Sequence, residues 1–169
     1  DAYNVAVGYN AGLAMTTGAS NTIVGGLAGD ALTTGSDNVA IGANALSTED
    51  TGGRNVAVGR GTLQNQNVDS NAYNVAIGYE AGNDITTGVN NVIMGGLAGD
   101  ALTTGAYNIA IGYQALSSED TGSVSIGIGY YALQAQNNAS NNYNIAIGHS
   151  AGAAITSGTQ NTLIGGLAG

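Results

Sequence analysis

The sequence contains no cysteine, proline, tryptophan, phenylalanine or lysine. The lack of cysteine excludes a disulfide scaffold and thiolate metal sites. Two arginines stand against eleven acidic residues, which gives a formal net charge of -9. Phosphate backbones and anionic membrane surfaces would repel such a chain, so we expect no nucleic-acid partner. We also expect no membrane insertion by this segment, because no stretch approaches the roughly 18 apolar residues of a membrane span.

Charged residues are also scarce, at 8% of the chain against about 25% in ordinary soluble domains. Apolar residues make up 43%, and 29 residues are glycine. Asparagine, threonine, serine and glutamine must therefore supply the solubility. Because the chain has no proline and no Gly-X-Y period, its glycines indicate many tight turns, not collagen or a flexible linker.

A five-residue pattern recurs ten times, beginning as Asn-Val-Ala-Val-Gly at Asn4. Its copies start 17, 17, 17 and 19 residues apart, and this cycle of 70 residues then repeats. Residues 2-71 and 72-141 are thus two super-repeats, and 142-169 is a partial third. Repeats of this kind bury their apolar side only against the next repeat. We therefore predict a single parallel β-solenoid segment over residues 1-169, with ten rungs of 17 to 19 residues. Because the chain opens without Met and ends inside a repeat, we expect it to be a fragment of a longer protein.

Within each rung, the pattern has the alternation of a short β-strand. We number positions from its first residue, which is position 0. Positions +1 and +3 are β-branched or apolar and would share one face of the strand, whereas +2 is alanine in six rungs. Because alanine allows close approach, we expect the +2 face to pack against other copies of the chain. A second strand is expected in the later half of each rung.

Two positions predict structural columns along the stack. Stacked asparagines hydrogen-bond along a ladder or cap a turn, and position 0 supplies the predicted ladder of Asn4, Asn21, Asn38, Asn55, Asn74, Asn91, Asn108, Asn144 and Asn161. Position +4 supplies the predicted turn glycines Gly8, Gly25, Gly42, Gly59, Gly78, Gly95, Gly112, Gly129, Gly148 and Gly165.

A compensation between two later positions predicts a narrow interior. Rungs with glycine at +8 carry a large apolar residue at +11, whereas rungs with leucine at +8 carry Glu or Gln at +11. One large apolar side chain per rung is what a narrow, closely packed core requires.

Candidate chemical groups are few. The triplets that begin at Asp50 and Asp120 read Asp-Thr-Gly, as in aspartic proteases, but they lie four rungs apart and cannot share a proton. The acidic pairs that they form with Glu49 and Glu119 could in principle hold Ca²⁺, but without a dense acidic loop we expect solvated turns. The single histidine, His149, is expected at the surface. We predict no catalytic residue, cofactor or metal ligand, and no enzymatic activity.

Tyrosines recur at two positions, so aromatic rings line defined edges of the predicted stack. Position +5 holds the candidate surface aromatics Tyr9, Tyr79, Tyr113 and Tyr130, and position -1 holds Tyr3, Tyr73, Tyr107 and Tyr143. We expect these rings to stack against neighbouring rungs or chains, with binding of surface glycans as the alternative.

The motif Asn-Val-Ala-Ile-Gly, followed by Tyr-x-Ala-Gly, Thr-Thr-Gly and Asn-Asn-Val-Ile, resembles the repeats of YadA-like trimeric autotransporter heads. It resembles still more closely the related repeats of marine phage tail fibres. The likeness covers the whole chain and is clearest in residues 74-82 and 108-122. It implies a left-handed β-roll in each chain, a homotrimeric fibre and a role in attachment. The rungs here are longer than those of autotransporter heads.

These observations favour a structural or adhesive segment of a phage tail fibre, a shaft or head involved in host attachment. Its expected partners are copies of itself and a host surface glycan or receptor, and its expected location is a virion tail fibre or a bacterial cell surface, both extracellular. A bacterial trimeric autotransporter adhesin head is the first alternative. An ice- or glycan-binding solenoid is less favoured, since adjacent threonines cannot both face outward from one strand.

Overall fold

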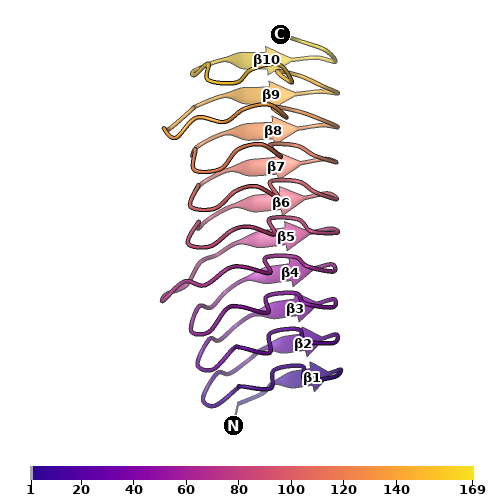
Figure 1. Cartoon of the computed structure of the whole chain (residues 1–169), viewed down its shortest axis with the longest axis vertical. Helices are drawn as coiled ribbons and strands as arrows, with labels where there is room; N and C mark the ends of the chain where they lie inside the picture. Colours follow the sequence, from indigo (N-terminus) through magenta and orange to yellow (C-terminus); the bar gives the residue numbers. More distant parts are fainter. Residues whose placement is uncertain (1) are drawn as a thin grey trace.

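The computed structural model describes residues 2-169 and is a rod made of stacked β-rungs (Figure 1). Ten strands and no helix occur in this range, and the strands form one parallel sheet in chain order. The strands are β1 (Val5–Val7), β2 (Thr22–Val24), β3 (Val39–Ile41), β4 (Val56–Val58), β5 (Val75–Ile77), β6 (Val92–Met94), β7 (Ile109–Ile111), β8 (Ile126–Ile128), β9 (Ile145–Ile147) and β10 (Thr162–Ile164). The predicted β-solenoid is confirmed. Without a helix, the described residues include no helical segment that could cross a membrane.

Equivalent positions of successive rungs lie directly over one another. Between β3 and β4, for example, Val39 pairs with Val56 and Ile41 with Val58. The 19-residue rungs keep the same register, since β4 pairs with β5 just as β3 pairs with β4. Their two additional residues are absorbed in loops, which project between β4 and β5 and again between β8 and β9 (Figure 1).

Each rung contains one strand, so the prediction of a second strand was wrong. A residue with positive φ at position +6, such as Asn10 (54°) or Asn44 (58°), interrupts the extended backbone after each strand. The remaining half of the rung is a series of turns that are still joined to the next rung. Gly12 N donates to Ala28 O at 3.0 Å, and Thr16 N donates to Thr33 O at 2.9 Å. The turns therefore extend the hydrogen bonding between rungs beyond the sheet.

The interior of the rod is lined by the +2 side chains. The fully buried members are Ile23, Ala40, Ala57, Ala76, Ile93, Ala110 and Ala146. The expectation that this face packs against other chains was wrong, and the opposite face points outward. Alanine suits +2 because the narrow interior also receives the leucines and isoleucines of positions +8 and +11, such as Leu46 and Ile85. Where +2 is the larger Ile23, position +8 is Gly29, and a Cβ added to this glycine would lie 3.2 Å from Ile23 Cδ1.

Two carboxylates are buried in this interior, although the sequence predicted solvated turns. Glu49 and Glu119 are both fully buried. Glu119 Oε1 accepts a hydrogen bond from Gly122 N at 2.8 Å. Its Oε2 accepts one from Gln136 Nε2 at 2.8 Å and one from Asn142 Nδ2 at 3.0 Å. Buried charge is tolerated where such donors surround it, and the glutamine at +11 of the next rung is therefore part of the core.

Candidate interaction face

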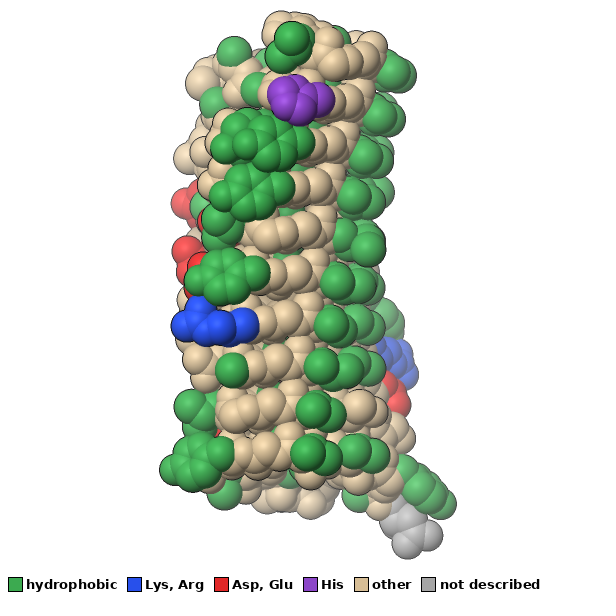
Figure 2. Space-filling view, turned by 90° about the vertical axis from the view of Figure 1, so that its right-hand side faces the viewer, with side chains coloured by type: hydrophobic (Ala, Val, Ile, Leu, Met, Phe, Trp, Pro, Cys, Tyr) green, Lys and Arg blue, Asp and Glu red, His purple; other side chains and the backbone are tan. Residues whose placement is uncertain are grey.

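The outer face of the sheet carries a continuous row of side chains that are apolar except for two threonines, which we call the apolar stripe. It consists of the +1 residues Val5, Thr22, Val39, Val56, Val75, Val92, Ile109, Ile126, Ile145 and Thr162 and the +3 residues Val7, Val24, Ile41, Val58, Ile77, Met94, Ile111, Ile128, Ile147 and Ile164. All are half-buried or exposed. Figure 2 shows hydrophobic side chains in a vertical row along the right-hand border of the rod.

Such a surface is unusual for a solvated chain. Single exposed apolar residues are common on proteins, but a contiguous apolar patch marks an interaction site. Met94 and Ile147 each expose 38% of their surface at the outer side of the sheet. The stripe includes every strand from β1 to β10, so an interaction through it would involve the whole length of the rod.

Two columns flank the apolar stripe, one at each end of the strands. The leading border is position -1, with Tyr3, Ser20, Asp37, Arg54, Tyr73, Asn90, Tyr107, Val124, Tyr143 and Gln160. The trailing border is position +5, with Tyr9, Gly26, Ala43, Arg60, Tyr79, Gly96, Tyr113, Tyr130, His149 and Gly166. Unlike the stripe, both borders vary strongly in size and charge from rung to rung.

In the first super-repeat, Arg54 fills the middle of the leading border. Its Nη1 donates to the Tyr73 hydroxyl at 2.5 Å, and its guanidinium lies 5.5 Å from the centre of the Tyr73 ring. On the other side, Arg54 Nε lies 3.6 Å from Asp37 Oδ2. The hydrogen bond with Tyr73 is the main cause that raises the pKa of Arg54, and Asp37 adds to it. This border is therefore held together by its own polar contacts.

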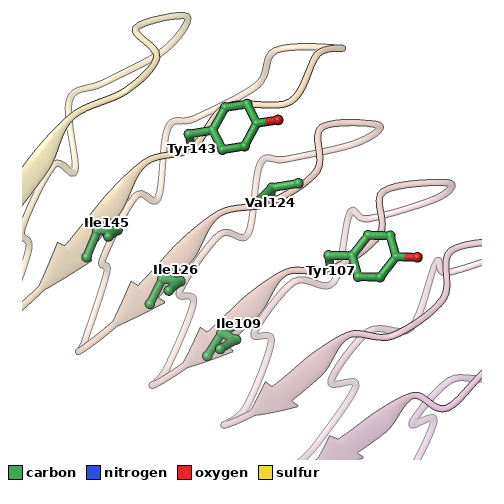
Figure 3. Close-up of a pocket in the computed structure, with 6 residues that line it drawn as sticks. All are labelled: Tyr107, Ile109, Val124, Ile126, Tyr143 and Ile145. Atoms are coloured by element: carbon green, nitrogen blue, oxygen red, sulfur yellow. The ribbon is translucent and has the colours of Figure 1, made fainter.

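In the second super-repeat, the same place is a groove. Tyr107 replaces the aspartate and Val124 replaces the arginine, while Tyr143 corresponds to Tyr73. The result is a cavity of about 240 Å³ lined by Tyr107, Ile109, Val124, Ile126, Tyr143 and Ile145. Figure 3 shows the two tyrosines on either side of Val124 and the three isoleucines along the strands. The groove opens on the apolar stripe and continues its apolar surface.

The trailing border carries a stack of aromatic rings. The Tyr113 and Tyr130 rings are stacked with centroids 5.6 Å apart, and His149 stacks on Tyr130 at 5.2 Å. Arg60 lies 5.6 Å from the centre of the Tyr79 ring and donates to its hydroxyl at 3.1 Å. The four candidate surface aromatics are exposed. Because the stacked rings turn their faces to one another, mainly their edges and hydroxyls remain for an outside partner.

The asparagines of the predicted ladder are brought together in one column along the rod. Asn21 N donates to Asn4 Oδ1 at 2.8 Å, and Asn38 N donates to Asn21 Oδ1 at 2.9 Å. The side-chain amide meanwhile donates to a turn carbonyl, as Asn91 Nδ2 does to Gly105 O at 2.9 Å. Most of these asparagines are buried, so their hydrogen-bonding groups are used within the chain.

The predicted turn glycines also form a column, and each has a φ between 127° and 140°. Side chains rarely adopt this backbone conformation. The rungs are also too close for one: a Cβ on Gly42 would lie 2.4 Å from Gly59 O. These positions connect each strand to the trailing border.

The two Asp-Thr-Gly triplets are separate features of the outer turns. The Asp120 carboxylate accepts a hydrogen bond from Thr103 Oγ1 at 2.5 Å, and Asp50 accepts the equivalent bond from Thr33. Within residues 2-169, no group of three or more His, Cys, Asp or Glu side chains is arranged to hold a metal ion. His149 is exposed and takes part in the aromatic stack.

The apolar stripe and the groove are the features that the sequence interpretation missed. A signal for the stripe was present, because a narrow interior that already receives a leucine or isoleucine from +8 or +11 suits the alanines of +2 better than the larger residues of +1 and +3. The groove requires knowledge of which residues of three successive rungs become neighbours.

No protein-family model matches this chain, and no curated protein or solved structure is significantly similar to it. Its function therefore has to be inferred from the apolar stripe and its two borders.

Proposed function

We propose that this chain is a segment of a homotrimeric surface fibre, most simply the shaft or head of a phage tail fibre that serves host attachment. The observation that carries the proposal is the apolar stripe, which faces outward along all ten strands of the stack. A bacterial trimeric adhesin head uses the same argument and is the alternative setting.

The stripe is suited to contact with other copies of the same chain. None of the eleven acidic residues occupies position +1 or +3, so the net charge of -9 does not oppose contact through this face. Burial of apolar surface stabilises an assembly by about 25 cal/mol per Å², and here the surface extends along the entire rod. A face of constant composition also allows copies to associate side by side over any number of rungs.

Three copies can form a closed ring through this face. If each copy turns its stripe toward a common axis, cyclic symmetry joins the leading border of one copy to the trailing border of the next. The resemblance to trimeric fibre repeats favours three copies over other ring sizes. The resulting rod has a dry centre and polar turns on its outside.

A structural role is also favoured by how the remaining polar groups are used. Glu119 and Glu49 are buried in hydrogen-bond networks, and Asp50 and Asp120 accept hydrogen bonds from threonines. A glycosidase needs two carboxylates that flank a substrate. We therefore propose a non-enzymatic function, and place any glycan or receptor contact secondary to the fibre role.

A matched pair of variants tests association through the stripe. Met94→Glu places a charge in the middle of the stripe, whereas Ala154→Glu places one at an exposed outer turn where another rung already carries Asp84. By sedimentation equilibrium, the unmodified chain and Ala154→Glu should have three times the chain mass of 16.5 kDa. Met94→Glu should sediment as a folded monomer. A monomeric unmodified chain, or a trimeric Met94→Glu variant, would refute the proposal.

The location of the fibre needs a separate experiment. Antibodies raised against this segment and coupled to gold should decorate filamentous projections in electron micrographs of virions or bacterial cells from the source of the sequence. Labelling confined to the cell interior would contradict a surface fibre, even if the chain were trimeric.

A further inference from the structure

We propose that the groove at Val124 receives the Tyr130 side chain of the neighbouring copy, and that this contact sets the register between the chains. The inference rests on the proposed homotrimer and adds to it a defined contact at the eighth rung. The occupant of the groove is thus a second copy of this chain.

The apolar stripe alone leaves the register undetermined. Its residues are nearly the same in every rung, so a slip of one copy by a whole rung would still bury Val and Ile against Val and Ile. Uniform surfaces of this kind are prone to slippage unless other residues specify the pairing. The two borders, which differ from rung to rung, are the part of the face that could supply this specification.

Symmetry brings the groove and Tyr130 to the same height. In a ring about the rod axis, each leading border meets the trailing border of the next copy at the same rung. Val124 forms the middle of the groove, and Tyr130 is the trailing residue of its rung. Tyr113 and His149 stack on either side of Tyr130 and would lie opposite the two tyrosine walls. An aromatic ring thus meets a groove that is apolar at its floor and aromatic at its sides.

In two rungs, the leading and the trailing border residue both change between the first and the second super-repeat. Where the first super-repeat has Asp37 at the leading border and Ala43 at the trailing border, the second has tyrosine at both. In the next rung, Arg54 and Arg60 are both replaced, by Val124 and Tyr130.

Contacts within one chain do not explain these joint differences. The two borders lie at opposite ends of a strand, six residues or roughly 20 Å of extended backbone apart. For residues 2-169, each aromatic and cation-π contact joins residues at the same end of the strands, including Tyr131 at position +6. In the first super-repeat the groove is closed by Arg54 itself, and Arg60 pairs with Tyr79 and Glu80 of its own chain. The groove at Val124 and the exposed ring of Tyr130, which stacks on Tyr113 and His149 of its own chain, thus lie in the same rung.

The backbone conformation of Val124 supports the view that valine stands at the groove floor because it makes a contact. Val124 has a φ of 60°, and it is the only β-branched residue with positive φ among residues 2-169. A β-branched side chain is strained in this conformation, whereas the equivalent positions hold Tyr, Ser, Asp, Arg, Asn and Gln. Asparagine tolerates it well, as Asn90 shows at a φ of 59°. Strain of this kind is retained where the residue serves a contact.

Two substitutions and their combination test the contact. Val124→Asn relieves the strain and makes the groove floor polar, and Tyr130→Ala removes the inserted ring. Each should raise the trimer dissociation constant at least about tenfold, while the melting temperature of the dissociated Val124→Asn chain stays equal or rises. The double variant should be no weaker than the worse single variant, because both remove one contact. Asn90→Ala, at the leading border of another rung, should leave the dissociation constant unchanged.

Crosslinking tests the register, since the chain has no cysteine of its own. A double variant with Val124→Cys and Tyr130→Cys, treated with a short bis-maleimide, should give covalent trimers. Val124→Cys combined with Gly96→Cys, two rungs away, should not. A trimer in which the second pair reacts instead of the first, or in which both substitutions leave association unchanged, would overturn the inference but not the proposed function. A monomeric unmodified chain would overturn both.

Discussion

At the scale of single residues, the closeness of successive rungs decides which side chains are tolerated. The +4 glycines combine a positive φ with a contact between backbones of adjacent rungs. Buried polar residues, in contrast, are tolerated where several N–H groups of neighbouring rungs point at them. A substitution at a +4 glycine destabilises the rod by adding a clash, whereas a substitution at a buried polar residue destabilises it by removing hydrogen bonds.

The substitution Gly42→Ala should destabilise the rod by at least about 3 kcal/mol, because it adds a clash to an unfavourable φ. Its Cβ would lie 2.4 Å from Gly59 O, whereas a Cβ on Gly165 in the last rung meets nothing within 4 Å. Both glycines have similar φ values, 133° and 128°. Gly165→Ala should therefore cost only about 1 to 2 kcal/mol. Urea unfolding followed by circular dichroism measures both, and equal losses would show that the clash is absent.

The substitution Glu119→Gln should cost about 1 to 3 kcal/mol, although it removes only a charge. Both carboxylate oxygens accept hydrogen bonds, from Gly122 N and from Gln136 Nε2 among others. An amide group would turn its own N–H toward one of these donors and leave it unpaired. Glu80→Gln is the control, since Glu80 makes only a partly exposed ion pair with Arg60, worth no more than about 1 kcal/mol. A thermal melt in which both variants behave alike would contradict the buried network.

A third residue-scale prediction concerns Asp100, whose Oδ1 is buried without a hydrogen-bond partner. Burial is the main cause that raises the pKa of Asp100, and the charges of Asp84 and Glu80 add to it. A raised pKa means that the folded state disfavours the carboxylate, so the penalty is present above the folded pKa and is relieved as the pH falls through it. Asp100→Asn should thus raise the melting temperature at pH 7, with a smaller gain near pH 4. The Asp69→Asn variant removes the same charge from an exposed position and controls for the change in net charge.

At the scale of the elements, each three-residue strand is too short to be stable alone and depends on the asparagine ladder beside it. Asn91 links three segments: it accepts a hydrogen bond from Asn108 N, donates to Gly105 O and donates its own N–H to Asn74 Oδ1. Unlike a sheet of long strands, this sheet therefore has its ends fixed by side chains. The turn opposite each strand is held in place by the same residue.

The substitution Asn91→Ala should destabilise the rod by about 1 to 3 kcal/mol, because it leaves a buried N–H and a buried carbonyl unpaired. Asn161→Ala should have a smaller effect in this chain, since β10 is the last strand of the sheet within residues 2-169. Hydrogen exchange followed by mass spectrometry would locate the loss. Faster exchange should be confined to the rungs next to position 91, and uniform exchange along the chain would contradict a local role of the ladder.

The elements also show how far sequence reasoning extends. The positions and the parallel stacking of the ten strands follow from the period, because residues at equal positions in a solenoid must lie over one another. The number of strands in each rung did not follow, since several rungs have a positive φ at residues that do not usually mark a turn, such as Leu27 (58°) and Leu97 (56°). The expectation that the +2 face of each strand points outward, toward other copies of the chain, was also wrong. Alternation shows that +1 and +3 share a face, but only the volume available inside a rung decides which face is inward.

The candidate site was predictable only in part. Recurrence identified the two tyrosine columns, and their exposure agrees with a role outside the core. The groove at Val124 depends on residues of three rungs and on a strained backbone conformation. Neither a repeat pattern nor a residue preference gives that information, because the groove arises where the second super-repeat differs from the first.

At the scale of the whole molecule, the chain is a rod with one apolar side and polar turns elsewhere. Its core is a single column inside the rungs that runs along the axis of the rod. Each added rung therefore lengthens the core and the apolar stripe equally. Hydrogen bonds along its axis join the rungs of the rod. In the proposed trimer, association through the stripe would depend on the same strands that stack the rungs.

Distance measurement between copies tests most directly that the apolar stripe faces the axis of the assembly. A nitroxide label attached through Met94→Cys lies on the stripe, and one attached through Ala154→Cys lies on an outer turn. Pulsed electron paramagnetic resonance at partial labelling should give a single short distance between copies for position 94 and a clearly longer one for position 154. Equal distances, a longer distance at position 94, or no dipolar coupling at either position would contradict an assembly with the stripe at its centre.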